Sequence, residues 1–398
     1  MQNIQADVPQ EIRAHRYPEL DALRGLAAST VVLFHLAMFG NSSSGYAPLM
    51  SSPLRIFVSG PQAVILFFLL SGFVLSAAQT SPRNPGYALY LAKRMCRLYL
   101  PFFAALIVAY AFASHFYLRT PTFNEWANST WGQKPVFKEL VLAALTRMPY
   151  AMEFNTAFWS VFLEIRISLV FPLLFLLVKR IPAWGSGLLL LTLLLITPFA
   201  KHHVEPLQAL TLFLFGILAF LHLQTLRRWM ALPSTRMRTI LLVASLLAYT
   251  FSLNPAHLSR AHANGSIAAD SVIAPQTVNG FGIHSVVQGE LQQVRFITCA
   301  VASLTLMLGA MMQPGMRQFL QHPFLLRLGA LSYSMYLMHG TVLFSMMRGL
   351  WGKISAGIFI PLYFLLVYAT SELFHLLVDA PAIQLGRRVG RSVRKHAG

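Results

Sequence analysis

Ionisable side chains lie inside long apolar segments of this 398-residue chain, where they are costly and therefore indicate a function. Arg24 and His35 share the first such segment. In a helix, this spacing puts both side chains on one face, about 16 Å apart along the axis. Histidine suits proton transfer near neutral pH and arginine suits anion binding, with Asp21 close enough to orient the guanidinium. The structural alternative makes Arg24 a surface anchor and His35 a packed histidine.

A second group of candidate residues combines a carboxylate with two cations. Glu164 is expected at a depth similar to His35, where it would hold one imidazole tautomer and stabilise the imidazolium form. An ion pair with Arg166 is the alternative, although residues two apart on a helix face different ways. Arg94 and Arg97 share a helix face, and this arrangement suits phosphate binding as well as anchoring at the cytoplasmic surface.

Three further ionisable residues lie in late apolar segments. His339 would either serve the site or pack between helices, whereas Glu372 and His375 are expected to pair with each other. The chain has no HExxH, GxSxG, Walker or paired CxxC signature, and Cys96 and Cys299 are far apart. We therefore expect no metal and no permanently bound cofactor.

The elements that must position these residues are apolar helices. The chain is 56% hydrophobic and only 11% charged, with a mean hydropathy of +0.58, whereas soluble domains have roughly 25% charged residues. The formal net charge is +18, but the basic residues lie between apolar segments rather than on one patch. A membrane protein is therefore predicted, and nucleic acid is not an expected partner.

We predict an all-α, polytopic transmembrane bundle of about ten helices with both termini in the cytoplasm. With the N-terminus inside, this count places most basic residues on the cytoplasmic side, and the longer connections at about 118–156 and 254–293 outside. Residues 1–19 would form a cytoplasmic segment, 20–380 the membrane domain and 381–398 a basic cytoplasmic tail. The predicted spans are 20–40, 57–78, 98–117, 157–178, 185–200, 206–223, 237–253, 294–313, 329–347 and 354–378.

Five motifs resemble, in the same order, those of the acyltransferase 3 family, integral membrane acyltransferases that modify carbohydrates. The first motif of that family has an Arg and a His separated by ten residues, as Arg24 and His35 are here. The chain departs from the family pattern after Glu164, where Ile165, Arg166 and Ser168 replace a second acid, a Gln and an aromatic residue. The matching stretches are YPELDALRGLAASTVVLFHL (17–36), FFLLSGFVLS (67–76), KRMCRLYLP (93–101), AFWSVFLEIRISLVFPLLF (157–175) and LGALSYSMYLMHG (328–340).

The resemblance implies a bacterial cytoplasmic (inner) membrane O-acyltransferase. Acyl-coenzyme A, expected to be acetyl-CoA, would bind as the donor substrate at Arg24, Arg94 and Arg97. The acceptor would be a hydroxyl of an extracytoplasmic carbohydrate such as a surface polysaccharide or lipopolysaccharide. His35 would deprotonate this hydroxyl or form a transient acyl-imidazole, supported by Glu164. Residues that would contact the acceptor or support the site are Trp159, Ser160, Tyr333, Tyr336 and His339.

The alternative function is a proton-coupled transporter or exporter of a sugar-containing molecule, with His35 and Glu164 as a proton relay. Such a relay does not need a phosphate-binding cluster at one face of the membrane. Many transporters also show repeated halves, which this sequence lacks. The enzyme is therefore the favoured hypothesis.

Overall fold

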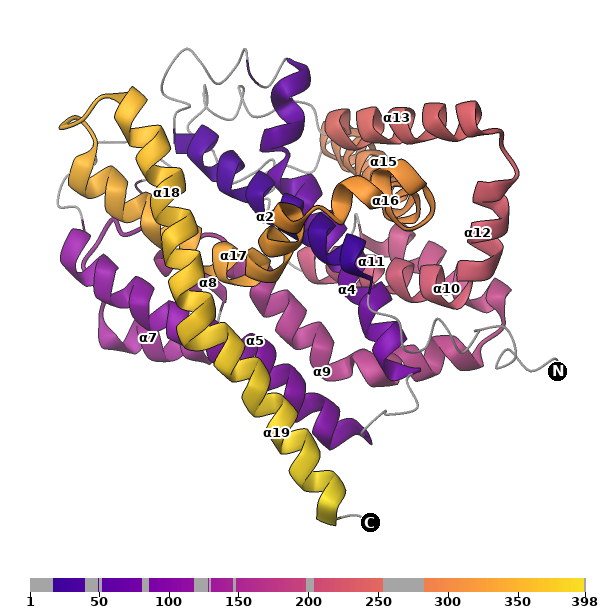
Figure 1. Cartoon of the computed structure of the whole chain (residues 1–398), viewed down its shortest axis with the longest axis horizontal. Coiled ribbons are helices and arrows are strands. Elements are labelled where there is room, and N and C mark those ends of the chain that lie inside the picture. Colours follow the sequence, from indigo (N-terminus) through magenta and orange to yellow (C-terminus); the bar gives the residue numbers. More distant parts are fainter. Residues whose placement is uncertain are drawn as a thin grey trace. The chain divides into compact units, whose positions relative to one another are not determined.

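The computed structural model describes residues 17–39, 49, 52–80, 86–117, 128, 130–145, 148–197, 204–252 and 283–396. These residues form helices and no strand, which confirms the all-α prediction (Figure 1). Among them, six helical segments are long and apolar enough to cross a bilayer, or seven if one bent pair counts as a span. The chain is therefore an integral membrane protein. The count of ten spans and the cytoplasmic position of both termini stay predictions.

The six spanning segments coincide with six of the predicted ones. The last of them is one continuous helical segment in which the π-helical turn η6 lies between two α-helices. The six are carried by α2 (Pro18–Phe39), α4 (Gly60–Gln79), α5 (Gly86–Phe116), α9 (Phe158–Arg180), α15 (Ile283–Met312) and the run of α18 (Ala356–Phe374), η6 (His375–Asp379) and α19 (Ala380–His396).

The other four predicted segments also fall on helices, but each lacks one property of a simple span. The helix α10 (Ala183–Ile196) has only 14 residues, and α13 (Thr235–Phe251) has 17. The pair α11 (Val204–Leu221) and α12 (Leu223–Ala231) bends by 74°. The helix α17 (Pro323–Leu350) has 28 residues, but polar side chains in its middle lower its hydropathy. All ten predicted segments therefore lie on helices, and the structure supports six of them as membrane crossings by length and composition.

The chain divides into two compact units. The first unit contains α2 up to Ala27, η3 (Pro53–Val58), α4 and the chain from Val170 to Ala330. The helices α4 and α11 pack closely in this unit because both have a glycine at the contact. A Cβ atom on Gly72 would collide with the Phe213 carbonyl, and one on Gly216 with backbone atoms of α4. The glycine in the stretch FFLLSGFVLS, Gly72, thus has a packing role at the contact between α4 and α11.

The second unit contains α2 from Ala28, the chain from α5 to Leu169, and the chain from Leu331 onward. The helices α5 and α19 lie side by side in it, seen in Figure 1 as a purple and a yellow ribbon. A Cβ atom on Gly386 of α19 would lie 3.3 Å from the Cβ of Cys96 on α5, so a small residue is needed there. The ring of Phe102 packs edge-on against Phe158 and Phe162, with centroids 5.2 and 4.9 Å away, and this joins α5 to α9.

Candidate active site

Two histidines from different helices of the second unit meet ring to ring. Nδ1 of His35 on α2 lies 2.8 Å from Nε2 of His339 on α17, and the two rings stack with centroids 5.0 Å apart. Nδ1 of His339 lies 3.1 Å from the carbonyl oxygen of Met335, one turn earlier on α17. His339 is fully buried, whereas His35 is half-buried. Only His35 of this pair is therefore accessible to a substrate.

The hydrogen-bond pattern assigns the tautomers of both rings. A carbonyl oxygen only accepts, so Nδ1 of His339 carries the proton that it shares with Met335. In a neutral His339, Nε2 then has a lone pair and accepts the Nδ1 proton of His35. His35 is left with a lone pair on Nε2, which is the state required of a general base or nucleophile.

A second hydrogen-bonded pair lies one turn from His339 on α17. The hydroxyl groups of Tyr336 and Ser160 are 2.6 Å apart, and Ser160 donates to the carbonyl of Ala157 at 3.2 Å. Because Ser160 uses its proton there, Tyr336 donates to Ser160. The ring centroids of Tyr336 and His339 lie 5.8 Å apart. Two residues predicted to support the site thus connect the start of α9 to the histidine-bearing helix.

Sequence reasoning missed Asn155, which fixes this junction. Its Nδ2 donates to the carbonyl of Leu337 at 3.0 Å, and its Oδ1 accepts from the backbone N–H of Ala157 at 3.0 Å. A Cβ atom on Gly340 would collide with the Asn155 side chain, so a larger residue there would displace the Asn155 amide. An Asn just before a predicted helix is a capping signal, and it could have indicated this role.

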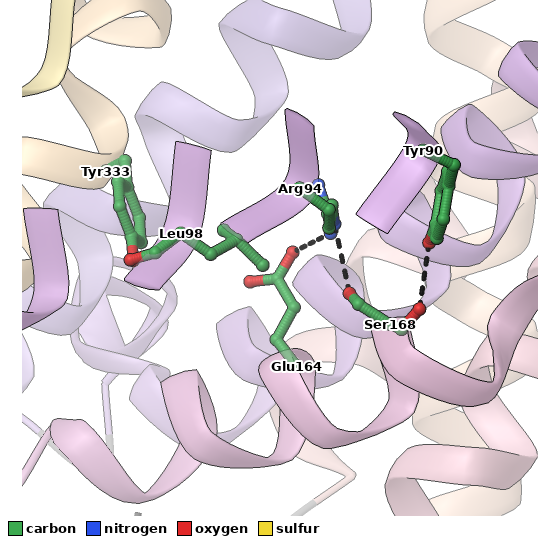
Figure 2. A network of polar contacts seen from close by, with 6 residues as sticks. All are labelled: Tyr90, Arg94, Leu98, Glu164, Ser168 and Tyr333. Carbon is green, nitrogen blue, oxygen red and sulfur yellow. Dashed lines mark hydrogen bonds and ion pairs between the residues drawn. The ribbon is translucent and has the colours of Figure 1, made fainter. Parts of the chain in front are cut away.

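The predicted arginine–carboxylate group forms a separate network between α5 and α9 (Figure 2). Nη2 of Arg94 lies 2.7 Å from Oε1 of Glu164, and Nε of Arg94 donates to Oγ of Ser168 at 3.0 Å. The side chains of Arg94 and Glu164 are 9% and 15% exposed. Tyr90 on the preceding turn of α5 donates to the Ser168 carbonyl at 3.1 Å. Ser168, which replaces the aromatic residue of the family pattern, therefore has a defined role in holding α5 against α9.

This network changes the expected roles of its members. Glu164 was expected to orient His35 or to pair with Arg166; the structure pairs it with Arg94, and Arg166 is exposed. Arg94 is buried, whereas Arg97, three residues later, is exposed. The two arginines therefore cannot contact a cytoplasmic phosphate in the same way, despite the face they share in sequence.

The remaining predicted site residues take other positions. Tyr333 donates to the carbonyl of Leu98 on α5 at 2.6 Å, as Figure 2 shows, and Trp159 is half-buried in the first turn of α9. Arg24 lies in the first unit, and its buried Nε makes no hydrogen bond within the described residues. It shares α2 with His35, as predicted.

The expected pairing of Glu372 with His375 is wrong. Nδ1 of His375 lies 2.9 Å from Oδ2 of Asp379, and Tyr368 donates to Glu372 at 2.8 Å. Ser334 of α17 also donates to Asp379, at 3.4 Å. Asp379 follows His375 by four residues within the π-helical turn η6, and its carboxylate is the group that contacts the imidazole. His375 therefore serves packing at the junction of α17 and η6.

A cavity of about 390 Å³ in the second unit lies beside α7 (Phe137–Ala144) and α8 (Met148–Phe154). Glu139, Glu153, Gln133 and Lys134 contribute polar groups to its lining. Burial, and to a smaller extent the Glu139 charge, raises the pKa of Glu153. In the described part of the chain, no group of three or more His, Cys, Asp or Glu is placed to hold a metal ion. The expected absence of a metal stays a prediction.

Comparison with known proteins gives two matches that cover these sites. The Acyl_transf_3 family model, described as an acyltransferase domain, matches residues 17–375, which include both the histidine pair and the Arg94–Glu164 network. The acyltransferase MdmB of Streptomyces mycarofaciens is 27% identical over an alignment of 400 positions, which covers 94% of this chain and 94% of that protein. No solved structure matches.

Proposed function

This chain belongs to the acyltransferase 3 family and is a membrane acyltransferase, and we propose that it acylates an extracytoplasmic carbohydrate. The donor in this proposal is acyl-coenzyme A, with acetyl as the first group to test, and the acceptor is a hydroxyl of a surface polysaccharide or lipopolysaccharide. The reaction takes place in the bacterial cytoplasmic membrane. The observation that carries the proposal is the hydrogen-bonded pair of His35 and His339.

In the first step, Nε2 of His35 takes the proton of the acceptor hydroxyl. The acceptor oxygen then attacks the thioester carbonyl, the carbon–sulfur bond breaks, and the leaving thiolate takes the proton back from His35 to give free coenzyme A. The hydrogen bond from Nδ1 to His339 keeps the lone pair on Nε2 and stabilises the imidazolium between the two transfers. The same lone pair would also serve a transient acyl-imidazole, and the geometry is compatible with both routes.

The Arg94–Glu164 network supports donor binding indirectly in this proposal. Arg94 is held by Glu164 and Ser168, so it fixes the position of α5 rather than contacting the donor. Exposed Arg97 and Arg24, whose buried Nε makes no hydrogen bond within the described residues, are each proposed as a phosphate contact. Charge-assisted bonds from guanidinium groups to phosphate are stronger than neutral ones, so each such contact would strengthen donor binding.

A carbohydrate acceptor is supported by the cavity beside α7 and α8. Its carboxylate, amide and ammonium groups match the donors and acceptors of sugar hydroxyls, and it belongs to the predicted outer connection at 118–156. Because the chain belongs to an acyltransferase family, the enzyme hypothesis is favoured over the transporter alternative.

The test is transfer of radiolabelled acetyl from acetyl-CoA by membranes that contain the protein. Label should accumulate in the carbohydrate fraction of the envelope, with one free coenzyme A thiol released for each acetyl transferred. Membranes with matched amounts of His35→Gln should show neither signal. Label confined to lipid or protein would contradict the carbohydrate acceptor, and equal labelling by His35→Gln would contradict the role of the histidine.

A further inference from the structure

A cavity of about 600 Å³ in the first unit lies at the start of α2. Residues of five helices, α2 included, line it. Tyr17 and Glu19 line it at the start of α2, and Arg227 of α12 also belongs to the lining. The apolar side chains of Met311 on α15 and Leu326 on α17 complete it together with Arg317 of α16 (Pro314–Leu320). The cavity thus combines two acidic side chains, Glu19 and Asp21, with two guanidinium groups and an apolar surface.

Glu19 is the feature of this cavity that points to a ligand. The residue is only 3% exposed, and its Oε2 is buried without a hydrogen-bond partner in the described part of the chain. A buried carboxylate oxygen without a donor is strongly unfavourable, so such an atom in a cavity wall indicates a missing N–H or O–H group. The ligand must therefore present a hydrogen-bond donor at this point.

The arginines indicate the other part of the ligand. Arg227 is close enough to Tyr17 to affect its ionisation: burial raises the pKa of Tyr17, and the Arg227 charge opposes that shift. The charge of Arg227 therefore acts inside the cavity, and Arg317 adds a second, exposed guanidinium to its wall. Paired guanidinium groups are typical of phosphate binding. A ligand with a phosphate and a separate donor group fits both observations.

We propose that this cavity binds the adenosine 3′-phosphate end of acyl-coenzyme A. Glu19 accepts the exocyclic amine of adenine, Arg227 and Arg317 bind the ribose 3′-phosphate, and Met311 and Leu326 contact the faces of the base. The assignment rests on the proposed acyl-coenzyme A donor.

The position of Arg24 extends the site along α2. It lies five residues after Glu19 within the first unit, about 8 Å along the helix axis, and its Nε has no partner in the described residues. Asp21 also lines the cavity and precedes Arg24 by three residues, where it can orient the guanidinium. The pyrophosphate, which follows the adenosine in coenzyme A, would bind Arg24. The start of α2 thus supplies the contacts for adenine and for the pyrophosphate, whereas Arg227 and Arg317 bind the 3′-phosphate.

The probe for this site is adenosine 3′,5′-bisphosphate, which lacks the thiol arm and so does not depend on the catalytic residues. Its binding is measured by titration calorimetry on the purified full chain in detergent. Arg227→Ala and Arg317→Ala should each weaken the affinity at least tenfold. The matched control is Arg228→Ala, an exposed arginine next to Arg227 that does not line the cavity and should leave the affinity unchanged.

Glu19→Gln tests the contact with the base. Inosine 3′,5′-bisphosphate has a carbonyl in place of the adenine amine, so the parent protein should prefer the adenosine compound. A glutamine amide can donate to that carbonyl, so the variant should lose most of this preference. Equal binding of both compounds by the parent protein would overturn the proposed contact with Glu19.

Two outcomes separate the site from the proposed function. If Arg227→Ala loses the nucleotide while the parent protein binds it but transfers no acetyl, the site stands and the acyl transfer fails. If both arginine variants bind the nucleotide as the parent does, the site is wrong whatever the transfer assay gives. An aminophospholipid headgroup also has an amine and a phosphate; variants that lose copurifying phosphatidylethanolamine but keep nucleotide binding would overturn the proposal.

Discussion

The histidine pair and the Arg94–Glu164 pair place polar groups inside a membrane protein in opposite ways. His35 and His339 are both neutral in the assigned tautomers and share one hydrogen bond, which leaves a lone pair on His35. Arg94 and Glu164 are opposite charges in contact, and Ser168 accepts a further N–H group of the arginine. The first pair can accept a proton, whereas a buried, hydrogen-bonded ion pair resists any change of charge.

The histidine pair can therefore take part in the reaction, whereas the Arg94–Glu164 pair positions helices. Half-buried His35 presents a reactive atom, and fully buried His339 holds its ring. Arg94 and Glu164 hold α5 against α9, and α5 also carries exposed Arg97. Variants of the two pairs should therefore change different kinetic parameters: kcat for the histidines, and the KM for the donor or the stability for the ion pair.

The largest expected effect is that of His35→Gln. Glutamine keeps a hydrogen-bonding group but cannot take a proton, so transfer should fall by about 10²–10⁴-fold, the usual contribution of a general base. Acetyl transfer by membranes with matched protein amounts measures this effect, and expression and membrane insertion serve as the control. Near-parental activity would mean that His35 only packs, and the base would then have to be His339 or Glu164.

Replacement of His339 should have the next largest effect. His339→Leu removes the group that accepts the Nδ1 proton of His35, so kcat should fall by about tenfold, the equivalent of one hydrogen bond of about 1.4 kcal/mol. His339→Gln should recover most of this loss, because a glutamine carbonyl can accept the same proton. A measurement of kcat and KM for both variants tests the tautomer assignment. Equal losses would indicate that the histidine contributes only packing.

Glu164→Gln should lower activity less than either histidine variant and should mainly raise the KM for acetyl-CoA, because Arg94 loses its anchor. Removing one partner of a buried ion pair also costs about 3–5 kcal/mol of stability, whereas replacing both with apolar residues is often neutral. The double variant Arg94→Met/Glu164→Leu should therefore unfold at a higher temperature than either single variant, measured by thermal melts in detergent. Additive losses of stability would contradict the coupling between these two residues.

The reactive residue types of the histidine site could be predicted from the sequence, but the contact between His35 and His339 could not. The positions of Arg24 and His35 on one helix could be calculated from their spacing, and His339 was recognised as polar in an apolar segment. Which helix faces His35 depends on tertiary packing, so Glu164 was assigned as the partner where the structure has His339. Similarly, the shared face of Arg94 and Arg97 did not show that α9 would cover only one of them.

The fold was predicted at the same level. Helix positions follow from the length of apolar runs, and all of the predicted segments fall on helices in the described residues. Whether a helix crosses the membrane depends also on what it packs against, and a count of apolar residues does not contain this information. The cases affected are α10, α13, α17 and the pair α11 and α12. Polar residues that serve the site lower the hydropathy of α17, and the bend of 74° between α11 and α12 has no signal in an apolar count.

The smallest expected effect is that of Tyr336→Phe, which removes the hydroxyl that donates to Ser160 at 2.6 Å. Ser160 keeps its own donation to Ala157, so the variant leaves no buried donor without a partner, and the loss should be about 0.5–1.5 kcal/mol of stability. Because the Tyr336 ring still packs 5.8 Å from that of His339, kcat should change by less than threefold. Ser160→Ala is the matched variant. It removes the acceptor that lies 2.6 Å from the buried Tyr336 hydroxyl, so it should lower the melting temperature more. A loss of kcat in Tyr336→Phe as large as that in His339→Leu would show that the tyrosine hydroxyl takes part in proton transfer. Tyr336 would then count as a reactive residue together with the histidines, and not as a supporting one.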